Sequence, residues 1–94
     1  MNIIEEENRI DIFFKLGKGK RVFTIVKYNI NDSTKLNISS ALKFLKYKLG
    51  CGGNLLDSKT IQLNGDHRRM VKILLICNIF DIEFEEKSII VHEY

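Results

Sequence analysis

The chain has 94 residues, of which 45% are hydrophobic and 29% are charged, values that predict one globular domain with a single core. This composition argues against a disordered chain. It also argues against a membrane protein, because no apolar run approaches the roughly 20 residues that a membrane span needs. The net charge of +3 favours an anionic partner only if the cations are clustered, so their positions decide.

The first residues of the chain are acidic, whereas a secretory signal is basic and then apolar. We therefore expect a cytoplasmic protein with a short tail at residues 1–8 and a folded domain at residues 9–94. Cys51 and Cys77 do not form a CxxC spacing, and we interpret both as reduced.

A β-hairpin is predicted at the start of the domain. Residues 9–16 alternate apolar with mainly polar side chains at the period of a half-buried strand, and residues 22–26 are β-branched and aromatic. The turn between them contains Gly17, Gly19 and three cations: Lys18, Lys20 and Arg21. We expect these cations to project into solvent.

A basic amphipathic helix is predicted next. Residues 29–35 have turn chemistry, Asn37 is a suitable N-cap and Gly50 supplies a stop. Apolar side chains repeat at helical spacing between the two caps: Ile38, Leu42, Leu45 and Leu49. The outer side of the helix carries Ser39, Lys43, Lys46 and Tyr47.

The second half of the chain predicts another hairpin, a helix and a last strand. Residues 54–56 and 60–64 have strand character around a short turn, and Asp66 is a candidate N-cap. The helix after it has a wide apolar stripe: Met70, Val71, Leu74, Leu75 and Cys77. An acidic segment at 81–86 then leads to a strand at 88–92.

The predicted order is β-β-α-β-β-α-β. It indicates an α+β fold in which two helices pack on one face of a mixed, mainly antiparallel five-stranded sheet. The other face is then only partly covered, so Phe13 and Tyr28 are either exposed contacts or core residues.

Groups for catalysis are few. A thiol nucleophile from Cys51 with His67 as its base lacks any local feature that activates the cysteine, and there is no GxxxxGK(S/T) phosphate loop. A zinc site would need four ligands to converge from separate positions: Cys51, His67, Cys77 and His92. We therefore expect no catalytic residue, no metal and no cofactor.

The cations form three groups, at the hairpin tip, on the first helix and at the start of the second: Lys18, Lys20 and Arg21; Lys43 and Lys46; Arg68, Arg69 and Lys72. Cations in a first helical turn oppose the macrodipole by about 0.3–1 kcal/mol each, whereas free N–H groups beside guanidinium groups suit a phosphate. Alternatively, Arg68 and Arg69 solvate that end or pair with Asp66 and the acidic segment, and Lys43 and Lys46 lie on an ordinary solvated face.

The hairpin tip has the reach to contact an irregular RNA backbone, although lysine there also favours solubility. No RNP-like aromatic motif accompanies it, which favours recognition of RNA shape or phosphate over base reading.

Four stretches of the chain resemble the translation initiation factor 1 family of eukaryotes and archaea. Residues 18–24 are similar to its basic Gly-Arg/Lys-Lys hairpin, and residues 49–53 are similar to its Ala/Gly-Cys-Gly/Asn-Gly turn. Residues 61–68 are similar to its Ile-Gln-Leu-Gln-Gly-Asp-His/Gln-Arg block, and Val91-His92 is similar to its closing Val-His-Gly-Phe. Departures stand at Tyr28-Asn29, where the family commonly has a glycine, and at Glu93-Tyr94.

The resemblance implies a monomeric factor that binds the small ribosomal subunit near the peptidyl site, beside initiator tRNA and mRNA, together with other initiation factors. Such a factor acts by binding: it hinders premature seating of initiator tRNA and so promotes accurate start-codon selection. The resemblance implies ribosomal RNA contacts at the hairpin tip (Lys18, Gly19, Lys20 and Arg21) and on the first helix (Lys43 and Lys46). Asp66 and Arg68 are motif positions, and we add Arg69 and Lys72 as candidate contacts because they lie beside Arg68.

Three alternatives remain open from the sequence. The same domain occurs in recycling and reinitiation factors. A small α+β hydrolase acting on a phosphate-containing substrate would use Arg68 at an anion site. A protein-interaction module would use the acidic residues 83–86.

Overall fold

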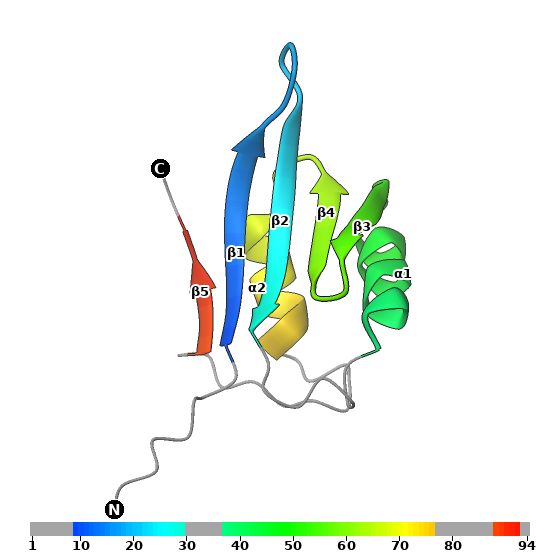
Figure 1. The fold of residues 1–94 in the computed structure, drawn as a ribbon, viewed down its shortest axis with the longest axis vertical. Coiled ribbons are helices and arrows are strands. Elements are labelled where there is room, and N and C mark those ends of the chain that lie inside the picture. Colours follow the sequence, from blue (N-terminus) through cyan, green and yellow to red (C-terminus); the bar gives the residue numbers. More distant parts are fainter. Residues whose placement is uncertain (1–8, 30–36, 77–87, 93–94) are drawn as a thin grey trace, which may run out of the picture.

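The computed structural model describes residues 9–29, 37–76 and 88–92. In this part of the chain the elements follow the predicted order (Figure 1). The strands are β1 (Arg9–Leu16), β2 (Val22–Asn29), β3 (Gly53–Asp57), β4 (Thr60–Asn64) and β5 (Ile89–Val91), and the helices are α1 (Ile38–Leu49) and α2 (Arg68–Ile76). Asn29, the first residue of the predicted turn at 29–35, belongs to β2, and the rest of that turn lies outside the described residues, as do Cys77 and the acidic segment at 81–86.

The sheet is mixed and has the strand order β3-β4-β2-β1-β5. β5 runs parallel to β1, while the other neighbouring pairs are antiparallel. Both helices contribute to the same core as the sheet, and this core consists of Ile10, Ile12, Val26, Tyr28, Ala41, Leu45, Ile61, Leu63, Val71, Leu75 and Ile89. The predicted α+β fold, with two helices on one face of a five-stranded sheet, is confirmed.

β2 is longer than the predicted strand at 22–26, because it pairs along both of its edges. Its pairing with β1 continues to Asn29, and its pairing with β4 reaches Lys27. Tyr28 therefore points into the core, where it is 2% exposed. Of the two readings left open by the sequence, the core position is the correct one for Tyr28.

The face of the sheet away from the helices contains a polar cluster centred on Asp11. Asp11 alternates along β1 with the core residues Ile10 and Ile12, and it is only 4% exposed. Its carboxylate accepts hydrogen bonds from Arg9 Nε at 3.1 Å and from the Asn29 amide, and it lies 2.9 Å from His92 Nε2. Phe13 is half-buried there because its ring stacks on His92, with 4.3 Å between the ring centroids.

Both predicted caps of α1 are confirmed. The Asn37 side chain accepts a hydrogen bond from Ser40 N at 3.0 Å, and Gly50 ends the helix with a left-handed backbone of φ 61°. Ala41 and Leu45 are the residues of α1 that are fully buried. The lysines consequently lie toward solvent, as the amphipathic pattern predicted.

Replacing Gly50 should destabilise the protein through backbone conformation alone. No heavy atom lies within 4 Å of the position that a Cβ would occupy at Gly50, so a new side chain meets no clash there. We expect Gly50→Ala to lower the free energy of unfolding by about 1–2 kcal/mol, the cost of a left-handed non-glycine residue. Gly50→Asn should lose less, because asparagine tolerates this conformation. Equal urea midpoints for Gly50 and Gly50→Ala would contradict this account.

α2 begins one residue later than the sequence predicted. The carbonyl of His67 accepts the first helical hydrogen bond, from Val71 N at 2.9 Å, so His67 and not Asp66 is the N-cap. The Asp66 carboxylate accepts a long hydrogen bond of 3.4 Å from Arg68 N.

The buried side of α2 differs in part from the predicted stripe. Val71 and Leu75 are buried as predicted, but Met70 is 48% exposed, because the buried residues of α2 face β1 and β5 and Met70 lies to one side. Neither described helix is long and apolar enough to cross a membrane.

Candidate RNA-binding surface

The tip of the β1–β2 hairpin extends beyond the rest of the sheet (Figure 1). Backbone hydrogen bonds close its turn, from Gly17 N to Arg21 O at 2.9 Å and from Arg21 N to Lys18 O at 3.4 Å, and Gly19 adopts φ 68° between them. Lys18, Lys20 and Arg21 are all exposed. The predicted cations are thus brought together at the end of a projecting arm.

The outer face of α1 is the second basic region. Lys43 is exposed and Lys46 is half-buried. Lys48 is also exposed, and its Nζ lies 5.7 Å from the centroid of the Phe44 ring. Lys48 was absent from the predicted set, because it follows the buried residues Ala41 and Leu45 at helical spacing and not the outer lysines.

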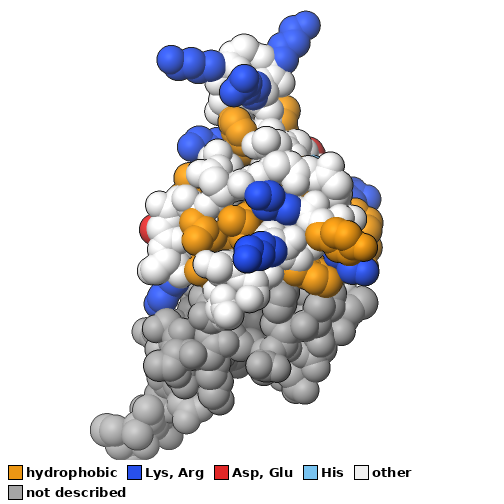
Figure 2. All heavy atoms as spheres, turned by 90° about the vertical axis from the view of Figure 1, so that its right-hand side faces the viewer, with side chains coloured by type: hydrophobic (Ala, Val, Ile, Leu, Met, Phe, Trp, Pro, Cys, Tyr) orange, Lys and Arg blue, Asp and Glu red, His pale blue; other side chains and the backbone are white. Residues whose placement is uncertain are grey.

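The hairpin tip and α1 are visible on one side of the molecule. In Figure 2, which views the side of α1 and β3, cationic side chains gather at the projecting tip and over the helix, with hydrophobic side chains beside them. Acidic side chains occupy only the margins of this view. We call the hairpin tip together with the lysines of α1 the basic face (Lys18, Lys20, Arg21, Lys43, Lys46 and Lys48).

The cations of α2 form a separate group. Arg69 is exposed and Lys72 is half-buried. α2 contacts β1 and β5, whereas α1 contacts β3 and β4 at the opposite edge of the sheet. The structure therefore does not bring Arg69 and Lys72 together with the lysines of α1.

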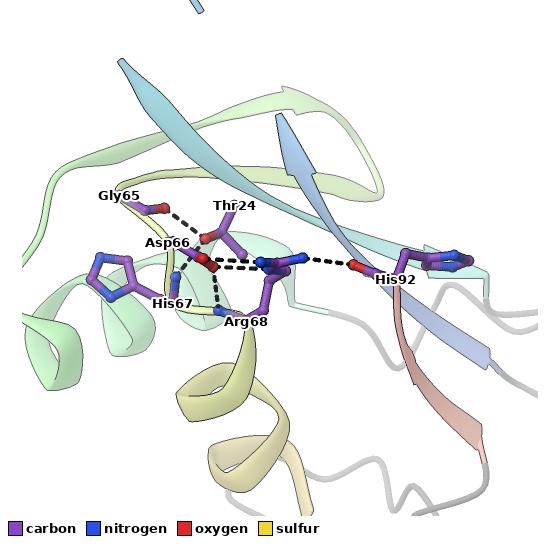
Figure 3. Close-up of polar contacts among 6 residues, drawn as sticks. All are labelled: Thr24, Gly65, Asp66, His67, Arg68 and His92. Carbon is purple, nitrogen blue, oxygen red and sulfur yellow. Dashed lines mark hydrogen bonds and ion pairs between the residues drawn. The ribbon is translucent and has the colours of Figure 1, made fainter. Parts of the chain in front are cut away.

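Arg68 contacts protein groups from three other positions, of which Figure 3 shows Asp66 and His92. Its Nε and Nη2 donate to the two oxygens of Asp66 at 2.9 and 3.0 Å, and its Nη1 donates to His92 O at 2.9 Å. Its guanidinium carbon also lies 4.9 Å from the centroid of the Phe14 ring. The side chain is only 18% exposed. Arg68 therefore pairs with Asp66, as one sequence alternative had it, and links α2 to β1 and β5.

Thr24 fixes the turn that precedes Arg68. Its hydroxyl donates to Gly65 O at 2.7 Å and accepts from His67 N at 2.8 Å (Figure 3). Thr24 itself is 0% exposed. No local pattern in the sequence indicates this role of Thr24, because its two partners lie more than 40 positions away in the chain.

The residues considered for catalysis, Cys51, His67 and Arg68, are not in the states that an enzyme would need. Burial raises the pKa of the Cys51 thiol, an effect that the nearby charge of Lys46 only partly offsets, so Cys51 is less readily ionised than an ordinary thiol. His67 Nε2 lies 2.8 Å from Asn64 O. The anion site of the hydrolase alternative is occupied by Asp66, which already holds the guanidinium of Arg68. Among the described residues, no group of three or more His, Cys, Asp or Glu side chains is placed to bind a metal.

Acid should weaken the Asp66–Arg68 pair. The hydrogen bond from Arg68 is the largest cause that lowers the pKa of Asp66. Because the pKa of Asp66 is lower in the folded protein than in the unfolded chain, its carboxylate stabilises the fold fully above the ordinary aspartate pKa of about 3.9. This contribution to stability is lost as the pH falls through the lowered pKa of the folded protein. Asp66→Asn should therefore be less stable than wild type at about pH 6, with the difference shrinking below about pH 4. A difference in urea midpoint that stays constant across this range would contradict the assignment.

The family model for translation initiation factor SUI1 matches residues 6–81, well over half of the chain. The chain belongs to the SUI1 family of translation initiation factors. A SUI1 translation factor homolog of Sulfolobus acidocaldarius is 39% identical over 97 residues, covering 98% of this chain and 90% of that protein. A homolog of Thermococcus onnurineus is 32% identical over 87 residues, covering 93% and 82%. A homolog of Acanthamoeba polyphaga mimivirus is 41% identical over 69 residues, covering 68% of this chain and 62% of the viral protein.

Membership in the SUI1 family confirms the resemblance seen in the sequence and indicates a non-enzymatic factor that works with the translation machinery. The stretches that carried the resemblance have different roles in the fold. Residues 49–53 end α1 and begin β3, and residues 61–68 form β4 and the turn held by Thr24 and Arg68. Residues 18–24 include the exposed hairpin tip. Residues 18–24 therefore present exposed cations, whereas residues 49–53 and 61–68 form the connections between elements of the fold.

Proposed function

We propose that this SUI1-family factor binds the small ribosomal subunit near the peptidyl site and promotes accurate start-codon selection. The observation that carries the proposal is the projecting hairpin, whose three exposed cations lie on the same side of the molecule as the basic outer face of α1. Phosphate contacts dominate the affinity of such cationic surfaces for nucleic acid. Folded RNA is recognised largely through its shape and backbone, which suits lysines and an arginine on a projecting loop.

The two parts of the basic face have different tasks in this proposal. Lys43 and Lys46 on α1 hold the factor on ribosomal RNA, while the hairpin, with Gly19 between Lys18 and Lys20, reaches toward the peptidyl site. A rigid arm in that position hinders the full seating of initiator tRNA until the start codon pairs. Discrimination then arises from binding and release in the cytosol, as a monomer, alongside other initiation factors.

The motif residues Asp66 and Arg68 act in this proposal mainly by positioning. Their pair connects α2 with β5, and Thr24 connects the same turn to β2, the second strand of the hairpin. Arg69 and Lys72 are candidate contacts at the far edge of the sheet, available to a second RNA segment. A hydrolase is not proposed, because the guanidinium it would use is already paired.

A reconstituted initiation assay tests the start-codon part of the proposal. Toeprinting on matched mRNAs with AUG or a near-cognate codon should show that the factor selectively lowers the near-cognate signal. A variant with Lys18, Lys20 and Arg21 changed to alanine should lose this selectivity, while Lys27→Ala, which removes another exposed lysine of the same hairpin, should keep it. The proposal fails if the wild-type factor leaves the ratio of the two signals unchanged.

A further inference from the structure

The side chain of Tyr47 on α1 is unusually exposed for a large aromatic residue. Its side chain is 81% exposed, the highest exposure among the large hydrophobic residues of the described chain. A ring that stays in water gains little of the free energy that burial supplies, so folding stability does not explain an aromatic residue here. Single exposed aromatics are common on protein surfaces, and the inference therefore depends on what surrounds this ring.

The surroundings of Tyr47 are cationic. Lys48 Nζ lies 6.0 Å from the centroid of the Tyr47 ring, within the range of a cation–π contact. Lys43 is exposed one helical turn earlier, and α1 contains no acidic residue along its length. The flat, accessible ring of Tyr47 thus lies among lysine side chains on the basic face.

A ring flanked by ammonium groups matches the chemistry of an unstacked nucleotide. Aromatic side chains stack on any base because every base has a π-face, and neighbouring cations neutralise the phosphates on either side. We propose that Tyr47, with Lys43 and Lys48 beside it, stacks on an unpaired base of ribosomal RNA. This inference rests on the proposed binding to the small subunit and adds a base contact that needs no RNP-like motif and reads no sequence.

Binding to purified small subunits separates stacking from charge. Tyr47→Ala should weaken binding about 10-fold, whereas Tyr47→Phe, which keeps the ring, should bind within about 2-fold of wild type. The slope of log affinity against log salt should be the same for Tyr47→Ala and wild type. Lys43→Ala should instead make that slope shallower by about one, because it removes a phosphate contact.

A fluorescence experiment tests the same contact directly. The chain has no tryptophan, so Tyr47→Trp introduces a single indole reporter. A short single-stranded RNA should quench its fluorescence, and an oligomer of the same length and charge with abasic positions should quench it much less. Equal quenching by both oligomers would overturn the proposal.

The outcomes distinguish this inference from the proposed function. If wild type binds the small subunit and Tyr47→Ala binds equally well, the stacking proposal is overturned and small-subunit binding stands; a protein occupant of this face would give that result. If wild type does not bind the small subunit, both proposals are overturned.

Discussion

Changing Lys18, Lys20 and Arg21 together to alanine should weaken binding to the small ribosomal subunit by roughly 10²- to 10³-fold at about 0.1 M salt. Each phosphate contact contributes about 0.7–0.9 to the slope of log affinity against log salt. The loss of three contacts should therefore make the slope shallower by about 2–3. Equilibrium binding over a salt series measures both quantities.

The matched control for the hairpin change is Lys27→Ala. Lys27 is an exposed lysine of β2, outside the turn that forms the hairpin tip. Its removal should leave the salt slope within error of wild type. Unchanged thermal unfolding of both variants would show that the fold is intact. An identical slope for wild type and the triple variant would mean that the hairpin tip does not contact RNA phosphate.

Thr24→Val should cause the largest loss of stability among single changes considered for this protein. Valine has nearly the shape of threonine, so the substitution removes the hydroxyl without leaving a cavity. Gly65 O and His67 N then lose the partner that they have at 2.7 and 2.8 Å. An orphaned buried polar group costs about 1–3 kcal/mol, so we expect a loss of about 2–3 kcal/mol in the free energy of unfolding.

Thermal and urea unfolding would measure this loss. For a domain of this size, about 2–3 kcal/mol corresponds to a fall in Tm of roughly 10–20 °C. Thr24→Ser keeps the hydroxyl and should retain most of the stability. If Thr24→Val and Thr24→Ser unfold at the same temperature, the hydroxyl does not hold the turn before α2.

The elements that could be predicted from the sequence are those specified by local chemistry. The apolar spacing of α1 and its two caps, Asn37 and Gly50, lie within one short stretch of chain, and each was confirmed. The exposure of the hairpin tip was equally predictable, because glycines and cations in a turn between two strands offer few side chains that favour burial. The sequence located the cations on the hairpin tip and on the two helices, but the position of α1 and α2 toward opposite edges of the sheet needed the structure.

The features that could not be predicted depend on partners far away in the chain. Asp11 is buried because His92 and Asn29 surround its carboxylate, and His92 is 81 positions away. The N–H of His67, the N-cap of α2, is bound by the hydroxyl of Thr24, which lies 43 positions away in the chain. The sequence predicted Arg68 as a candidate phosphate ligand and offered its pairing with Asp66 as an alternative, but its contacts with His92 and Phe14 depend on the fold. Local patterns cannot reveal such tertiary contacts.

Co-sedimentation of the wild-type protein with purified small and large ribosomal subunits, from eukaryotic and archaeal sources and over a salt series, tests the central claim most directly. The account predicts saturable binding to the small subunit that weakens steadily as salt rises, with little binding to the large subunit. Equal binding to both subunits, or binding to neither, would contradict it.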